Sequence, residues 1–158
     1  MEKVSINKDM HLSEHYTLGE VTKTSVKTAG ENIPSHVAIE NLKNLCENWL
    51  EDLRYSNNVL YGDRDMPIII TSGYRSPEVN KAVGGSPTSN HLTGCAVDIR
   101  CAGIEQALRY ANILMDIADG TKRDYDELFI ERNKQGRYWI HFAVRPKENR
   151  RKTAFIQT

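Results

Sequence analysis

Two long stretches with helical periodicity constrain the fold of this chain more than any other feature. In residues 35–55 apolar side chains recur mostly at steps of three and four, and Ser35 stands where it can cap the first turn. Residues 104–118 repeat this pattern and are followed by Gly120, a residue type that favours a helix end. Because an amphipathic helix must cover its apolar stripe, both helices need a sheet or another helix to pack against.

Short segments rich in β-branched and aromatic residues can supply that sheet. We predict strands at residues 68–71, 95–99, 126–132 and 138–144, and the polar, glycine-containing segment 133–137 predicts a hairpin between the last two. Strands and helices do not alternate regularly. We therefore predict an α+β fold, with a small, mostly antiparallel sheet and the two long helices packed on one side of it.

Three shorter features complete the expected structure. Residues 17–25 are predicted to form a short helix, because Thr17 and Glu20 have the spacing of a capping box. Ser76, followed by a proline, predicts the start of another short helix. Residues 86–94 have neither helical nor strand periodicity and are predicted to form an ordered loop.

Length and charge limit the domain organisation and the classes of partner. A chain of 158 residues is about the size of one domain, so we expect a single domain over residues 1–158, with flexible ends at 1–11 and 146–158. Lys plus Arg and Asp plus Glu both number 21, which gives no net charge. No global field therefore favours nucleic acid or an anionic membrane, and any partner must be recognised by a local site.

The cysteines and the N-terminal sequence bear on the cellular compartment. Cys46, Cys95 and Cys101 are odd in number and match no CxxC metal pair, so we expect buried free thiols rather than disulfides. The N-terminus has no signal-peptide pattern, and no segment approaches the ~18 consecutive apolar residues of a membrane helix. The expectation is a protein made in the cytoplasm.

Histidine and aspartate side chains predict a metal site. Zinc in a hydrolytic site takes three protein ligands from His and Asp or Glu and keeps a fourth position for water. His91 and Asp98 are separated by a loop in which Gly94 allows a turn, and His141 lies on the last predicted strand, flanked by Trp139 and Phe142. These three side chains are candidate ligands of one cation.

Four sequence motifs surround these residues: YTLGE at 16–20, TSGYRSP at 71–77, GGSPTSNHLTGCAVDI at 84–99 and WIH at 139–141. These motifs resemble those of the zinc D-alanyl-D-alanine carboxypeptidase family. That family includes wall-cleaving phage endolysins and vancomycin-resistance D,D-dipeptidases, and it shares its zinc site with lysostaphin-type peptidases and hedgehog domains. The resemblance extends from about residue 12 to residue 144 and implies that His91, Asp98 and His141 bind Zn²⁺.

The same resemblance implies roles for two further residues. Arg75 matches the arginine of the family that binds substrate near the scissile bond, and a guanidinium can hold a carboxylate or carbonyl by paired hydrogen bonds. Ser89 is expected either to bind substrate or to cap the loop before His91.

The general base is the point at which the sequence departs from the family. Many relatives carry Glu or Asp three residues before the second histidine, but this chain has Tyr138 there. Glu131 is the preferred substitute, because a hairpin loop with an odd number of residues centred near Gly136 would place it opposite His141. Glu127 and then Asp126 are the next candidates.

Together these observations predict a zinc metallopeptidase that hydrolyses peptidoglycan stem peptides, as a D-Ala-D-Ala carboxypeptidase or a related endopeptidase. The alternative is a zinc-containing domain that binds peptidoglycan without cleaving it, which Tyr138 motivates. We expect a monomer that acts at the cell wall. Either release through a partner pore, as for a phage or prophage lysis protein, or an export signal that has been removed would reconcile this site of action with the sequence.

Overall fold

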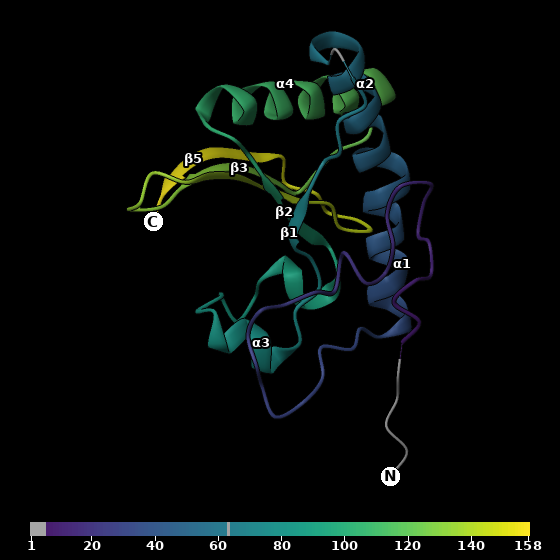
Figure 1. Ribbon diagram of the computed structural model, residues 1–158, viewed down its shortest axis with the longest axis vertical. Helices are drawn as coiled ribbons and strands as arrows, with labels where there is room; N and C mark the ends of the chain where they lie inside the picture. The colour runs from purple at the N-terminus through teal and green to yellow at the C-terminus, as the bar shows by residue number, and fades with distance from the viewer. Residues whose placement is uncertain (1–5, 63) are drawn as a thin grey trace.

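A computed structural model describes residues 6–62 and 64–158 and places a single sheet at the centre of the fold (Figure 1). The helix α4 lies over one face of the sheet, and α3 lies on the other side. The elements, in chain order, are α1 His36–Leu45, the π-helical turn η1 Cys46–Leu50, α2 Glu51–Tyr61, β1 Ile70–Ser72, α3 Pro77–Ala82, the 3-10 turn η2 Asn90–Thr93, β2 Ala96–Arg100, α4 Ile104–Thr121, β3 Glu127–Arg132, β4 Tyr138–Ala143 and β5 Lys152–Gln157.

The sheet has five strands in the order β1-β2-β4-β3-β5. The pairs β1/β2, β2/β4 and β3/β4 are antiparallel, and only β5 runs parallel to its neighbour β3. This arrangement confirms the predicted α+β fold with a mostly antiparallel sheet.

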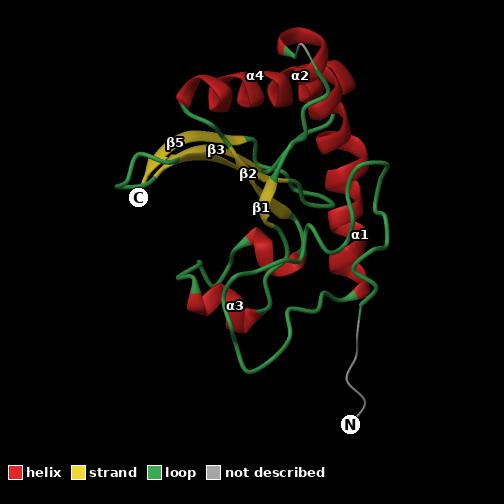
Figure 2. Cartoon of the chain, in the orientation of Figure 1, coloured by secondary structure: helices red, strands yellow, loops and turns green. Residues whose placement is uncertain are grey.

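The helices α1 and α2, joined through η1, form one continuous rod beside the sheet, and α4 forms the second long helix (Figure 2). Ser35 caps α1 by accepting a hydrogen bond from the backbone N–H of Ala38. The buried indole of Trp49 packs edge-on against Phe142, with ring centroids 5.2 Å apart. The helices thus cover one face of the sheet, as their apolar stripes require. Among the described residues, none of the helices is long and apolar enough to cross a membrane.

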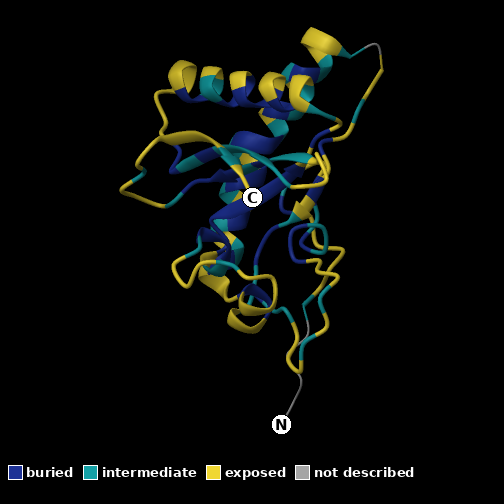
Figure 3. Cartoon of the chain, turned by 90° about the vertical axis from the view of Figure 1, so that its left-hand side faces the viewer, coloured by how far each residue is buried: buried dark blue, intermediate teal, exposed yellow. Residues whose placement is uncertain are grey.

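The two faces of the sheet differ in chemistry because side chains alternate along each strand. The face toward the core carries large apolar residues, and the burial map shows buried segments at the centre of the molecule (Figure 3). The central strand β2 is almost wholly buried, whereas the edge strand β5 is exposed. On the opposite face, Asp98, His141, Phe129 and Ala154 are consecutive cross-strand partners. One row of side chains thus crosses four strands, and this row carries the candidate site.

The predicted helix at residues 17–25 is wrong, although its capping interaction forms. Thr17 and Glu20 hydrogen-bond reciprocally, with the backbone N–H of Glu20 donating to the Thr17 hydroxyl over 3.3 Å. However, the N–H of Leu18 bonds the carbonyl of Met10 at 2.8 Å, and that of Gly19 bonds the carbonyl of Lys8. In addition, the carbonyl of Val21 accepts a hydrogen bond from the N–H of Tyr74 at 2.8 Å and is not paired within a helix, so the region forms turns.

The expectation of a flexible C-terminal end is wrong for the last strand. Arg150 makes hydrogen bonds of 3.0 and 2.9 Å to the two carboxylate oxygens of the buried Asp126. Directly after this contact, β5 pairs with β3 over its whole length. A long-range ion pair thus fixes the segment that sequence periodicity left unassigned. At the other end, residues 1–5 of the expected flexible range lie outside the described residues, and Met10 is held by its bond to Leu18.

The three cysteines are free and buried, as predicted.

Gly94 offers a test of the local geometry around the site. Its φ of 73° lies in the left-handed region, and a Cβ there would stand 2.4 Å from the carbonyl oxygen of Ala38. Gly84 has a φ of 76° and open space around it, so it is a matched control. We expect Gly94→Ala to lower the free energy of unfolding by about 1–3 kcal/mol more than Gly84→Ala in urea titrations. Equal losses would contradict the steric argument.

Candidate metal centre

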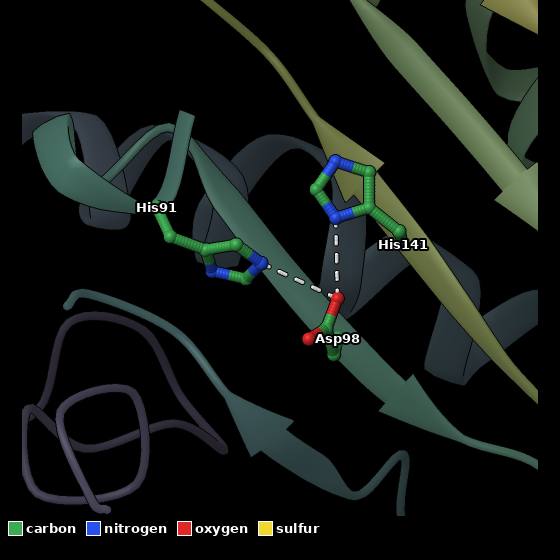
Figure 4. Close-up of side chains that lie close together, drawn as sticks. All are labelled: His91, Asp98 and His141. Carbon is green, nitrogen blue, oxygen red and sulfur yellow. Dashed lines mark hydrogen bonds and ion pairs between the residues drawn. The ribbon is translucent and has the colours of Figure 1, made fainter. Parts of the chain in front are cut away.

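Three different elements place His91, Asp98 and His141 together (Figure 4). Asp98 on β2 pairs directly with His141 on β4 in the antiparallel register. His91 comes from the turn η2, which Gly94 ends in a left-handed conformation before β2 begins. The loop therefore folds back, so that its histidine faces the carboxylate seven residues later.

The distances fit a tetrahedral metal. Asp98 Oδ1 lies 3.4 Å from His91 Nε2 and 3.2 Å from His141 Nδ1, and all three ligand atoms lie within 4.8 Å of one another. Ligands about 2.1 Å from a zinc ion at tetrahedral angles stand about 3.4 Å apart. The side chains are no more than 12% exposed. The donor set of two imidazoles and one carboxylate is the type that zinc takes in hydrolytic sites.

Each imidazole has its second nitrogen held by a neighbouring group. His91 Nδ1 lies 2.7 Å from the carbonyl oxygen of Gly73, which leaves Nε2 to face Asp98. His141 Nε2 lies 3.0 Å from Glu127 Oε1, which leaves Nδ1 to face Asp98. Such partners fix the tautomer and the ring orientation of metal-binding histidines. Both rings are thus oriented for a metal by residues outside the ligand set.

The protonation equilibria show how tightly the centre is coupled. Burial alone would raise the pKa of Asp98, but the charge of His91 and a hydrogen bond from His141 hold it well below its usual range. Burial would lower the pKa of His141, but its hydrogen bonds with Asp98 and Glu127 raise it to about 9. Without a metal, a proton on His141 therefore balances the buried carboxylate.

Arg75 lies beside this centre, as the resemblance implied. Its Nη2 is 3.3 Å from Asp98 Oδ2, and its Nε donates to the hydroxyl of Ser72 at 3.2 Å. A further contact of 3.4 Å joins Nη1 to the amide oxygen of Asn80. The guanidinium is thus fixed at the edge of the metal cluster.

Ser89 caps the turn η2, because its hydroxyl accepts a hydrogen bond from the backbone N–H of His91 at 3.2 Å. It also lines the cleft over the metal centre. Ser89 therefore caps the turn before His91, which is one of its two expected roles. Substrate binding by Ser89 stays a prediction.

An open cleft of about 400 Å³ lies over the cluster. Its floor includes Phe129, whose ring stacks on that of His141 with centroids 5.4 Å apart. Sequence reasoning missed this aromatic contact, because it depends on which residue of β3 pairs with His141. The cleft is lined by Arg75, Gly85, Ser86, Thr88, Ser89, Asn90, His91, Asp98, Glu127, Phe129, Glu131, His141, Arg145, Arg150, Lys152 and Ile156.

Glu131 lines this cleft, but it is not the direct cross-strand partner of His141. The loop 133–137 is centred on Gln135, one residue earlier than expected, so Glu131 pairs with Trp139 and Phe129 pairs with His141. The loop length is still odd, and Glu131 therefore shares the face of His141. The Trp139 indole N–H donates a hydrogen bond to Glu131. Burial, followed by the charge of Asp98, raises the pKa of Glu131.

Glu127 and Asp126 are already occupied by other contacts. Besides His141, Glu127 accepts a hydrogen bond of 2.7 Å from the side-chain amide of Asn90, and the hydrogen bond from His141 lowers the pKa of this glutamate. Burial would raise the pKa of Asp126, but Arg150 and Asn90 lower it to about 2. Asn90 thus connects both carboxylates, a role that no sequence motif indicated.

Tyr138 and Phe142 lie away from the His91–Asp98–His141 cluster. Tyr138 is three residues from His141 and Phe142 is one, so strand alternation places both on the other face of the sheet. Phe142 is fully buried against Trp49, and Tyr138 faces Phe155 with ring centroids 6.5 Å apart. Of the two aromatic residues that flank His141 in the sequence, Phe142 therefore does not shield the site, whereas Trp139 lies on the site face.

A comparison with protein families finds one matching family model, described as Peptidase M15, over residues 14–127. The matched region contains Arg75, His91 and Asp98, and it ends at the first residue of β3, before His141. A search of curated proteins finds no match.

The contact between Glu127 and His141 predicts an effect on metal affinity. Removing such a partner of a ligating histidine typically weakens metal binding by about 10–100-fold. We expect this loss for Glu127→Gln in zinc titrations against a competing chelator. Glu131→Gln is the matched control, because Glu131 contacts Trp139 and no ligand. Equal zinc affinities for Glu127→Gln and the wild type would contradict this role of Glu127.

The raised pKa of His141 predicts how the stability of the metal-free protein depends on pH. The ordinary pKa of 6.5 is raised to about 9 in the folded state, so the proton stabilises the fold fully below pH 6.5. This contribution is lost as the pH rises through 9. With chelator present, we expect the melting temperature of the wild type to fall over this range more steeply than that of His141→Gln. Parallel curves would show that the proton on His141 does not stabilise the fold.

Proposed function

Because the chain belongs to the peptidase M15 family, we propose that it is a zinc-dependent peptidase that hydrolyses peptidoglycan stem peptides. The observation that carries this proposal is the His91–Asp98–His141 cluster, whose spacing suits a tetrahedral metal and which lies at the bottom of an open cleft. The three donors leave a coordination position for a fourth ligand, as hydrolytic zinc sites require.

Zinc, when bound, polarises a carbonyl group and increases the acidity of water. The residues of the chain supply the remaining functions. Glu131 takes the proton from the attacking water and then passes it to the leaving amine. Arg75 holds the carbonyl or the terminal carboxylate next to the scissile bond by hydrogen bonds from its guanidinium.

The environment of Glu131 supports its choice as the base. A general base works best when its pKa is close to the working pH, and burial shifts Glu131 in that direction. Glu127 has a lowered pKa and is engaged by His141 and Asn90. The side chain of Asp126 is fully buried and bound by Arg145 and Arg150. Of these three acids, Glu131 has the fewest contacts that would have to break for it to accept a proton.

Within this proposal, the specific activity is that of a D-Ala-D-Ala carboxypeptidase or a related endopeptidase that acts on the cell wall as a monomer. Arg75 supports a carboxypeptidase, because a guanidinium beside the metal suits the free carboxylate of a terminal residue. Access to the wall after release, as in phage-mediated lysis, is part of the same proposal.

Glu131→Gln tests the proposed chemistry. The amide cannot accept the proton, so we expect kcat on a D-Ala-D-Ala stem pentapeptide to fall by about 10²–10⁴-fold while zinc binding is retained. The measurement is release of free D-alanine, with zinc content determined on the same samples. Glu105→Gln, an exposed glutamate at the start of α4, controls for the loss of one negative charge.

Two outcomes would contradict the proposal. Cleavage that survives complete removal of zinc by chelator would exclude a metallopeptidase. A zinc-loaded wild type that binds purified wall but cleaves neither the wall nor the pentapeptide would support the alternative of a wall-binding domain.

A further inference from the structure

A second cleft, of about 620 Å³, opens where β2 ends and β4 begins. Its lining includes two arginines, one from the end of β2 and one from the hairpin loop, and an indole from β4. The cleft is lined by Thr71, Arg100, Cys101, Asn133, Arg137, Tyr138 and Trp139. None of these residues belongs to the metal cluster or lines the cleft above it.

The second cleft is nevertheless connected to the metal centre. Arg100 follows Asp98 by two residues, and Trp139 precedes His141 by two, so both pairs share a face of the sheet. Arg100 and Trp139 are themselves cross-strand partners. Two residues along a strand correspond to about 7 Å. The Trp139 indole also donates to Glu131, which lines the first cleft, so this tryptophan lies at the boundary between the two.

The charges of this cleft are uncompensated. Arg100 and Arg137 are exposed, and neither guanidinium forms an ion pair or a hydrogen bond with any residue in the described part of the chain. No acidic residue lines the cleft. By contrast, Arg145 and Arg150 beside the metal centre are paired with Asp126. The second cleft therefore offers two arginines that are free to bind an anion.

The side chains also indicate the kind of anion. Arginine presents a planar fork that matches a carboxylate, and an adjacent indole offers an apolar surface to the carbon chain that carries it. Thr71 and Asn133 add neutral polar groups to the lining. A peptide carboxylate carried on an apolar carbon chain fits this combination of side chains.

We propose that Arg100, Arg137 and Trp139 form a subsite that binds a side-branch carboxylate of the stem peptide, away from the scissile bond. This inference rests on the proposed function, because it assumes that a stem peptide occupies the first cleft. An extended peptide advances about 3.3 Å per residue, so a carboxylate two or three residues from the scissile bond reaches the second cleft. Acidic stem peptides are then preferred over their amidated forms.

Three stem pentapeptides provide the test: one with both the D-glutamate and the diaminopimelate carboxylates free, and two in which one of these groups is a carboxamide. We expect amidation of one position to lower kcat/KM of the wild type by about 10-fold, mainly through KM. Arg100→Gln and Arg137→Gln should lower kcat/KM for the acidic peptide and remove most of this discrimination.

Arg123→Gln is the matched control, because Arg123 is exposed, lies after the end of α4 and lines neither cleft. It should keep the full preference for the acidic peptide. If neither amidation changes kcat/KM, or if the two cleft variants discriminate as well as the wild type, the subsite is excluded. Cleavage of all three peptides with equal efficiency would thus overturn this inference while leaving the proposed function intact.

Binding to the zinc-loaded Glu131→Gln protein separates recognition from chemistry. Calorimetry with the acidic and amidated peptides should show the same preference in Kd, and the added Arg100→Gln substitution should abolish it. Equal Kd values for the acidic and amidated peptides would overturn the subsite even if no variant cleaves any peptide.

Discussion

The pairing of Asp98 with His141 across β2 and β4 is the interaction on which the rest of the site depends. A carboxylate with 12% of its side chain exposed loses most of its hydration, and it can remain charged only if cations and donors replace the water. His91, His141 and Arg75 all face it. In the metal-free protein, the proton on His141 supplies the compensating charge. A divalent metal would displace that proton, so the same geometry that stabilises the buried aspartate prepares a metal site.

The third strand gives two glutamates different tasks through their position relative to His141. Glu127 and Glu131 flank Phe129, the residue directly opposite this histidine. Glu127 is held by His141 and Asn90, which stabilise its charged form and lower its pKa. Within the described part of the chain, the Glu131 side chain has only the indole of Trp139 as a hydrogen-bond partner, and burial raises its pKa. One carboxylate is thus suited to orient a ligand and the other to exchange a proton.

The sequence singled out the three residues that the structure brings together, because residue types and short spacings determine this cluster. His91, Gly94 and Asp98 lie within one loop and strand, and His141 was identified by the residues around it. The cross-strand partner of Glu131 was harder to predict from the sequence, because it depends on which residue lies at the centre of the hairpin loop. Moving that centre by one residue shifts the cross-strand partner of Glu131 by two positions, from His141 to Trp139, but leaves Glu131 on the same face of the sheet. The predicted face was therefore right, and the predicted partner was wrong.

Long-range contacts account for what the sequence did not predict. The strand β5 follows an ion pair between Arg150 and Asp126, residues that no local pattern connects. Its register sets Lys152 beside Glu127 and Ile156 beside Glu131, so this strand extends the site face beyond β3. Both Lys152 and Ile156 line the cleft over the metal centre. The C-terminal segment therefore contributes residues to the cleft and forms an edge strand of the sheet. It does so outside the region matched by the family model, which ends at residue 127.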